Sequence, residues 1–291
     1  MYAHIFATIA PIFICAIIGY SWARLKIPYE QAFLSRLVLN VGVPALVIGT
    51  LSKTNMPGQD LLRVVSAAAA VLGTTLVAAF LLCRCFRLPV ATYLAPLIFP
   101  NTVNMGLPVS LFAFGQEGLA IALGIYLVVS LAQFSIGVAV VSGEYTAGKT
   151  LGSPIIWSGA IAAALVATGT HLPLWLQNSL DLIGNFVIPV MLITLGVSLA
   201  QLRLGDAWRS LLLGTVRIAM GCGVGILVSE LMALEGPLRG VVIIQSSMPA
   251  AVFNYILAFK FQRSPEAVAG IVVASTALSF ISLPLLLWFL L

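Results

Sequence analysis

The residues best suited to binding a polar solute lie in one short segment of the first half of the chain. Residues 99–108 read Phe-Pro-Asn-Thr-Val-Asn-Met-Gly-Leu-Pro within an otherwise apolar run. A proline lacks an N–H group and frees the carbonyl four residues earlier, so Pro100 and Pro108 predict a broken helix. Carboxamides both donate and accept hydrogen bonds, so the asparagines at the break could bind a solute. The residues assigned to this site are Asn101, Asn104, Gly106 and Pro108.

A second segment of the same kind lies in the other half. Residues 245–249 read Gln-Ser-Ser-Met-Pro and are followed by Asn254. Peptide groups freed inside hydrocarbon must be satisfied by protein, water or a ligand, so two breaks at membrane depth imply a lined cavity. The half-helices after the breaks would turn their N-terminal ends toward this cavity, which favours an anionic group. The residues assigned here are Gln245, Ser246, Pro249 and Asn254.

Two further prolines have two interpretations. Pro44 and Pro189 each follow an asparagine by four residues and free the carbonyl of that asparagine. Each indicates either a simple kink, in which the asparagine side chain hydrogen-bonds the backbone of its own helix, or a further part of the polar site. A single proline in a continuing apolar pattern favours the kink. The helix-breaking prolines are then Pro44, Pro100, Pro108, Pro189 and Pro249.

Arg217 is the only strongly charged residue well inside a predicted helix. Charge at that depth is expensive and typical of a functional position, so Arg217 either contacts the solute or clamps freed carbonyls between helices. Mid-helix hydroxyl and amide groups also have two interpretations, because they could line the cavity or bond their own helices. If Ser130, Gln133 and Thr276 line it, their oxygens could bind a sodium ion. No firm metal site and no cofactor are predicted.

These positions require helices that cross a membrane. The chain is 61% hydrophobic and 8% charged, whereas roughly a quarter of the residues of a soluble domain are charged. A span takes about 20 apolar residues, so the 291 residues predict a single all-α membrane domain with ten crossings and no nucleic-acid partner. The predicted helices are residues 4–23, 31–51, 61–83, 91–115, 118–142, 153–171, 175–200, 207–232, 236–260 and 266–289.

Basic residues are distributed unevenly between the two ends of these helices. One end holds Arg24, Lys26, Arg36, Arg84, Arg87, Lys149, Arg203, Arg209, Lys260 and Arg263, and the other holds Lys53, Arg63 and Arg239. Because basic residues concentrate on the cytoplasmic side, the end with the larger group is predicted to be inside. Ten crossings then place both termini outside.

The two halves of the chain share landmarks at a separation of roughly 145 residues, which predicts an internal duplication. Asn40 and Pro44 correspond to Asn185 and Pro189, and Pro108 corresponds to Pro249. Five helices per repeat is an odd number, so repeat two (146–291) must be inverted relative to repeat one (1–145). Inverted repeats that meet at broken helices are typical of secondary transporters.

The motifs of these segments resemble the auxin efflux carrier family, which includes plant PIN-FORMED carriers and bacterial carriers for malonate and related acids. The resemblance covers the whole chain and depends on Asn101-x4-Gly106-x-Pro108, Gly196-x-Ser-Leu-Ala200 and Met248-Pro249-x4-Asn254. It implies that residues 4–23, 31–51, 153–171 and 175–200 form a scaffold that often dimerises, and that residues 61–142 and 207–289 form a moving transport unit. It also implies crossovers at Pro108 and Pro249, with Asn101, Asn104 and Asn254 near the substrate. Unlike many plant members, the chain has a short connection at residues 143–152.

We therefore expect a secondary transporter of small organic anions, such as auxin-like or dicarboxylic acids, that works by an elevator-like movement in a bacterial cytoplasmic membrane. A cation/proton antiporter on a similar scaffold is the alternative, although such a protein normally has an acidic residue at the crossover. No paired carboxylates, histidine cluster or Cys/His arrangement indicates an enzyme.

Overall fold

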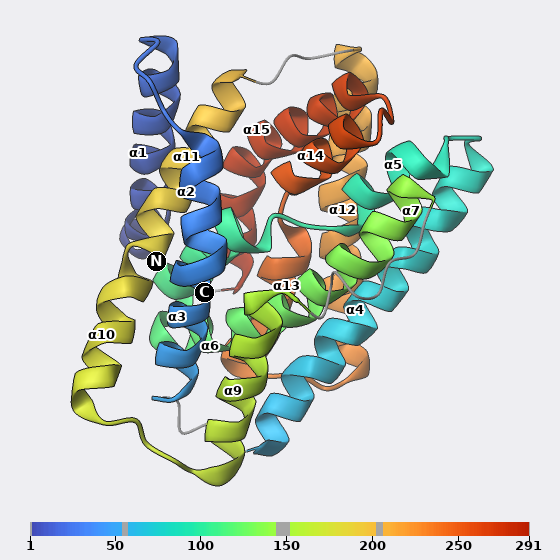
Figure 1. Ribbon diagram of the computed structural model, residues 1–291. Helices are drawn as coiled ribbons and strands as arrows, with labels where there is room; N and C mark the ends of the chain where they lie inside the picture. The colour runs from blue at the N-terminus through green and yellow to red at the C-terminus, as the bar shows by residue number, and fades with distance from the viewer. Residues whose placement is uncertain (1, 54–57, 144–151, 202–205, 291) are drawn as a thin grey trace.

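The computed structural model describes residues 2–53, 58–143, 152–201 and 206–290, which are helical apart from short connections and one isolated bridge between two extended segments (Figure 1). Within these ranges six helical stretches are long and apolar enough to cross a membrane, and two shorter apolar helices accompany them. The six are Gln31–Leu51, Asp60–Cys85, Thr102–Ser142, Leu174–Gln201, Ala207–Leu231 and Pro265–Leu290. The chain is therefore a polytopic helical membrane protein.

One group of helices, on the left of Figure 1, contains elements from both halves of the chain. α1 (Tyr2–Arg24) packs along α11 (Val187–Gln201), and α3 (Val43–Leu51) packs against α9 (Pro154–Thr168) and α10 (Leu174–Asn185). α2 (Gln31–Leu37), η1 (Val38–Gly42) and α3 form one continuous helix. Glycines allow α1 and α11 to touch, because a Cβ atom at Gly19 or Gly196 would overlap the backbone of the facing helix. We call these elements the first group.

A second group contains the remaining helices. Its first-half members are α4 (Gly58–Cys85), α5 (Val90–Ile98), η2 (Thr102–Gly106), α6 (Leu107–Ala132), η3 (Gln133–Gly137) and α7 (Val138–Ser142). Its second-half members are α12 (Ala207–Leu231), α13 (Gly236–Ser247), α14 (Val252–Lys260) and α15 (Pro265–Leu290). α12 packs against α4, α13 and α15. α6 is kinked at Gly115, whose φ of 64° is readily adopted only by glycine. The sequence analysis places the boundary between helices 91–115 and 118–142 at this position.

Each half contains one helix with a true interruption, and the two interruptions cross. α5 ends at Ile98 and the chain becomes helical again at Thr102, while α13 ends at Ser247 and α14 begins at Val252. The two extended segments form an antiparallel bridge at Pro100 and Ala250. The Asn101 N–H donates to the Pro249 carbonyl at 2.7 Å, and the Ala251 N–H donates to the Phe99 carbonyl at 3.1 Å. Peptide groups that each break leaves without a helical partner are therefore partly hydrogen-bonded by the other break.

The prolines differ in what they do to their helices. Pro100 and Pro249 lie within the crossing segments. Pro108 lies in α6, eight residues after Pro100, and the π-helical η2 precedes it; Pro44 likewise follows η1 within a continuous helix. Wider π-helical turns relieve a proline's clash with the preceding turn at the expense of a kink. Pro189 lies three residues after Phe186, where α10 and α11 meet. In the segment 99–108, the interruption is thus at Pro100 rather than at Pro108.

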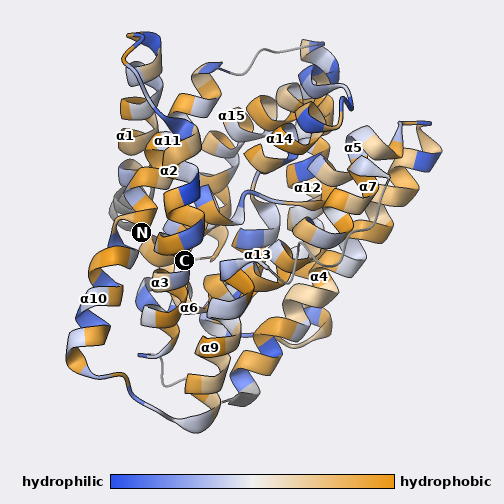
Figure 2. Ribbon diagram, viewed as in Figure 1, coloured by the Kyte–Doolittle hydropathy of each residue, from blue (hydrophilic) through white to orange (hydrophobic). Residues whose placement is uncertain are grey.

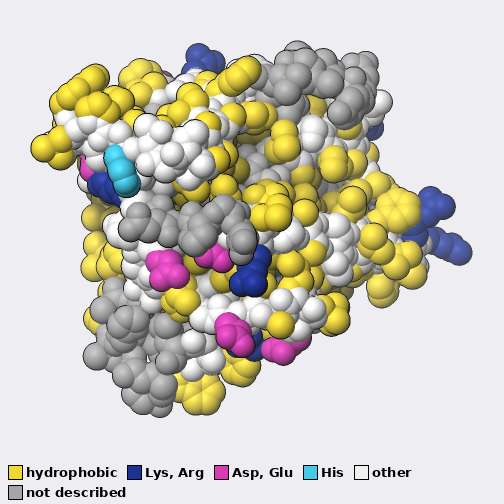
Figure 3. Space-filling model, turned by 90° about the horizontal axis from the view of Figure 1, so that it is seen from below, with side chains coloured by type: hydrophobic (Ala, Val, Ile, Leu, Met, Phe, Trp, Pro, Cys, Tyr) yellow, Lys and Arg dark blue, Asp and Glu magenta, His cyan; other side chains and the backbone are white. Residues whose placement is uncertain are grey.

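Hydrophilic residues are concentrated at the two ends of the molecule and in its middle, at the crossing (Figure 2). The connections between α1 and α2, α4 and α5, and α14 and α15 lie toward one end (Figure 1). Together with the last turns of α1, α4 and α14, they contain six of the ten predicted inner basic residues: Arg24, Lys26, Arg84, Arg87, Lys260 and Arg263. The opposite end, viewed in Figure 3, shows a group of acidic side chains. Lys149 and Arg203, and most of the connection 143–152, lie outside the described residues.

Candidate functional site

A pocket of about 130 Å³ lies where the crossing faces the first group of helices. Its lining combines carboxamides, hydroxyls and aromatic rings and includes no charged side chain among the described residues. Residues that contribute polar atoms include Asn101, Asn104, Tyr126, Ser130, Gln133 and Thr194. The N-terminal ends of two helices, η2 with α6 and α14, also border it, at Thr102 and Val252. N–H groups in the first turn of a helix have no acceptor within that helix and carry partial positive charge.

Two asparagines present hydrogen-bonding atoms at this pocket. Asn101 is 3% exposed, and its Oδ1 accepts from the Asn104 N–H at 3.3 Å, which caps η2. The Nδ2 atom of Asn101 has no partner among the described residues. The Asn104 side chain is half-buried and makes no hydrogen bond to the described residues. A buried donor without a partner indicates a missing ligand or water, because leaving it unpaired costs about 1–3 kcal/mol.

Asn254 forms hydrogen bonds that connect the elements around the crossing, outside the pocket lining. Its Nδ2 donates to the Phe99 carbonyl at 3.1 Å, and its Oδ1 accepts from Gln133 Nε2 at 3.2 Å. Asn254 is buried and does not line the pocket, whereas Gln133 does. The carboxamide assigned from the sequence to the solute is thus used to tie α14 to the first break and to η3.

Gln245, Ser246 and Arg217 lie on the opposite side of the crossing. They border a separate cavity of about 20 Å³, which is room for about one water molecule. Gln245 Nε2 donates to Ser110 Oγ at 3.3 Å, and Arg217 Nη2 donates to the Ser246 carbonyl at 3.1 Å. A Cβ atom at Gly106 would overlap the Gln245 side chain, so this glycine permits close packing. The structure therefore divides the assigned residues between a pocket side and a second, tightly packed side, which we call the backing side.

The sequence analysis missed the contribution of the first group to the pocket. Thr194 and Ser198 of α11 line it, and each hydroxyl donates to a carbonyl of its own helix, at 2.7 and 2.8 Å. Their oxygens accept from the Tyr29 hydroxyl at 2.6 Å and from Gln31 Nε2 at 2.9 Å, which fixes the start of α2 against α11. The spacing of four residues, which puts both hydroxyls on one helix face, was the available signal.

The residues considered for sodium are not all at one place. Ser130 and Gln133 line the pocket, and Ser130 Oγ donates to the Leu127 carbonyl at 3.0 Å. Thr276 does not line it, and its hydroxyl donates to the Val272 carbonyl of its own helix at 2.7 Å. Among the residues that the structure describes, no group of three or more His, Cys, Asp or Glu could hold a metal ion.

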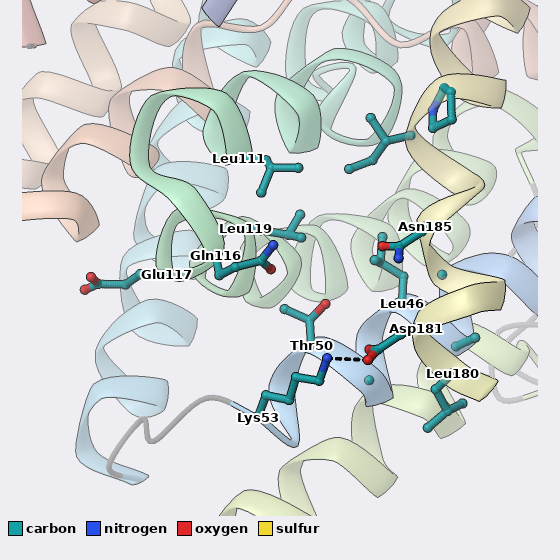
Figure 4. Close-up of a pocket in the computed structure, with 15 residues that line it drawn as sticks. Leu46, Thr50, Lys53, Leu111, Gln116, Glu117, Leu119, Leu180, Asp181 and Asn185 are labelled. Carbon is teal, nitrogen blue, oxygen red and sulfur yellow. Dashed lines mark hydrogen bonds and ion pairs between the residues drawn. The ribbon is translucent and has the colours of Figure 1, made fainter. Parts of the chain in front are cut away.

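A larger pocket of about 720 Å³ lies toward the other end of the interface between the two groups (Figure 4). Lys53 and Asp181 form an ion pair beside it, and Asp181 also accepts from Gln177 Nε2 at 3.0 Å. Figure 4 shows the side chain of Gln116 directed into this pocket from α6. α11 lines the larger pocket at Ile188 and Pro189 and the smaller one from Met191 to Ser198, so the two cavities follow each other along one interface.

Comparison with known proteins finds relatives along almost the whole chain. An uncharacterized transporter of Methanocaldococcus jannaschii is 24% identical over 301 residues, covering 96% of this chain and 97% of the relative. An uncharacterized transporter of Methanothermobacter thermautotrophicus is 25% identical over 297 residues, covering 96% of each protein. These relatives are transporters rather than enzymes. The sequence profile of the membrane transport protein family matches residues 4–144 and 138–287. The chain therefore belongs to the membrane transport protein family, the family of the auxin efflux carriers.

Proposed function

We propose that the protein is a secondary transporter of small organic anions and that the 130 Å³ pocket is its substrate site. The observation that supports this most strongly is the arrangement at the crossing. Two helix N-terminal ends, the unpaired Asn101 Nδ2 and the unbonded Asn104 carboxamide border one uncharged pocket. N-terminal helix ends attract anions through their free N–H groups and partial positive charge. A carboxylate would supply acceptors for all of these donors.

The substrate is a carboxylate with a largely apolar body or a small dicarboxylic acid. Tyr126, Phe134 and Phe253 line the pocket beside the amides and offer surfaces for an apolar group. Ligand sites of this kind combine an apolar lining with a few placed polar groups that fix orientation. The membrane potential is worth about 2.3 kcal/mol per charge per 100 mV, so an inside-negative potential alone could drive export of a monoanion.

The mechanism that we propose is alternating access with an elevator-like movement. The chain forms ten spans in two inverted repeats, 1–145 and 146–291; the first group is the scaffold and the second is the transport unit. Support comes from the two pockets, which follow each other along the interface between the groups. In transporters with broken helices, the substrate site lies at the crossing and one unit moves against the other. The scaffold also supplies the contact of a homodimer, and both termini face outward from a cytoplasmic membrane.

The test is solute flux in liposomes that contain the purified protein, with an imposed potential and a panel of labelled acids. The Asn104→Ala variant should lose at least about 90% of the flux of the best acid, because its carboxamide is free to bind the solute. Its unfolding temperature should remain that of the parent. The matched control is Asn178→Ala, since Asn178 is exposed on α10 and lines neither pocket.

Two results would overturn the proposal. The first is unchanged flux in Asn104→Ala, which would remove this pocket from the transport path. The second is a sodium-induced proton flux without acid transport. That result would favour the cation/proton antiporter, the alternative with the same type of scaffold.

A further inference from the structure

The two sides of the crossing carry helix ends of opposite polarity. α5 ends at Ile98 and α13 ends at Ser247, and both ends border the 20 Å³ cavity on the backing side. Carbonyls in the last turn of a helix lack intrahelical partners and carry about half a negative charge per helix end. Two such ends at one place amount to roughly one negative charge in a region of low dielectric.

Arg217 is the charged side chain at these two ends. It is 1% exposed, and Nη2 donates to the Ser246 carbonyl in the last turn of α13. No acidic side chain lines the cavity, and Arg217 forms no ion pair with the described residues. A buried guanidinium without compensation would cost several kcal/mol. Nε and Nη1 have no hydrogen-bond partner among the described residues. The partial negative charge at the carbonyl ends of α5 and α13, which border the same cavity, is therefore the compensating charge that the described residues offer to Arg217.

The sequence of α12 is arranged to bring Arg217 to this position. A Cβ atom at Gly221, one turn after Arg217, would overlap the Ser246 carbonyl oxygen. A Cβ atom at Gly225 would overlap the Ser246 hydroxyl. The two glycines allow α12 to lie directly against the last turn of α13. This approach gives the guanidinium its contact with the freed carbonyl.

The pocket side has no corresponding charge. The N-terminal ends of η2 with α6 and of α14 border the 130 Å³ pocket, whose described lining contains no Asp or Glu. We propose that Arg217 is a specificity-determining residue that acts without touching the solute. By neutralising the carbonyl ends of α5 and α13, it leaves the N-terminal ends as the only unbalanced charge of the crossing, so the pocket prefers anions. This inference deepens the proposed function and depends on the same pocket.

The experiment measures the sign of the potential in the pocket without requiring the substrate. A cysteine is introduced by Asn104→Cys in a background where Cys15, Cys83, Cys85 and Cys222 are replaced by serine or alanine. Its reaction rate is compared between an anionic and a cationic methanethiosulfonate reagent of similar size. With Arg217 present, the anionic reagent should react faster. Arg217→Met and Arg217→Gln should each lower the anionic-to-cationic rate ratio at least about tenfold, and Arg217→Lys should preserve it.

The controls separate a local from a general effect of charge. Arg84→Met removes one positive charge from the exposed end of α4, so it should leave the rate ratio unchanged. Elution volume and unfolding temperature confirm that each variant is folded, and Arg217→Gln retains a donor for Ser246 if Arg217→Met unfolds. A ratio that does not respond to Arg217→Gln, or a thiol that reacts with neither reagent, would overturn the inference. Absence of acid flux in the parent protein, together with an anionic preference of the thiol that depends on Arg217, would instead overturn only the proposed function.

Discussion

The two sides of the crossing are built from the same pair of broken helices but differ in space, charge and origin. The pocket side is open, contains amides and hydroxyls, and draws residues from both groups of helices. The backing side is tightly packed, contains a buried guanidinium, and is formed within the second group alone. The comparison indicates that one side supports the broken backbone while the other remains free to bind. Substitutions should therefore change stability on the backing side and transport on the pocket side.

The largest expected effect is on the backing side, at Gly221. Gly221→Ala places a methyl group into the Ser246 carbonyl oxygen, which is backbone and cannot turn away. Overpacking of this kind typically lowers the free energy of unfolding by about 1–3 kcal/mol, and occasionally more. Thermal unfolding in detergent measures the loss. Gly223→Ala is the matched control because a Cβ atom there meets nothing within 4 Å. Equal unfolding temperatures for the two variants would contradict the close contact of α12 with α13.

A somewhat smaller loss is expected at Asn254, which ties α14 to the first break and to η3. Asn254→Ala removes the bonds to the Phe99 carbonyl and to Gln133, both of which are buried. Loss of buried hydrogen bonds should lower the free energy of unfolding by about 1–3 kcal/mol. A double-mutant cycle with Gln133→Ala isolates their shared bond, and the coupling should be on the order of 1 kcal/mol. Strict additivity of the two changes would show that this bond contributes nothing.

The hydroxyl of Ser275 offers a finer comparison within one helix. Ser275 Oγ accepts from the Ala250 N–H at 3.1 Å, so Ser275→Ala leaves a buried donor of the crossing unpaired. Thr276→Val removes only a bond from the side chain to its own helix. Ser275→Ala should therefore lower the free energy of unfolding by about 1 kcal/mol or more, and Thr276→Val should cost less. The reverse order in chemical denaturation would contradict a supporting role for Ser275.

The smallest change in stability is expected on the pocket side. Ser198→Ala removes the acceptor of Gln31 Nε2; Ser198 is buried, whereas Gln31 is only partly buried. The free energy of unfolding should fall by only about 0.5 kcal/mol, because the partly exposed Gln31 amide can bond to water instead. Acid flux should nevertheless fall several-fold, because α2 is then less firmly held beside the pocket. A variant that transports as well as the parent would exclude Ser198 from the site.

Much of this architecture could be predicted from the sequence because apolar runs and prolines act locally. The segments 99–108 and 245–254 contain both interruptions, and the amides at 101 and 104 lie at the pocket. Both Pro100 and Pro108 predicted a break. That only Pro100 interrupts the helix could not be predicted, since whether a π-helical turn accommodates a proline depends on tertiary packing. The hydrogen-bond partner of Arg217 could not be predicted either. It is a carbonyl 29 residues later in the sequence, and two glycines allow the two helices to approach closely enough for this bond.

The paired backbone bonds between the two extended segments have a mechanical consequence. Asn101 with Pro249 and Ala251 with Phe99 exchange donors and acceptors across the crossing, as neighbouring strands of a sheet do. Separating the segments would leave these peptide groups without partners in an apolar interior, where each costs several kcal/mol. α5 and α13, and the helices that follow them, are therefore joined at the ends that adjoin the breaks, so displacement of any one of these helices carries the other three along as a rigid body.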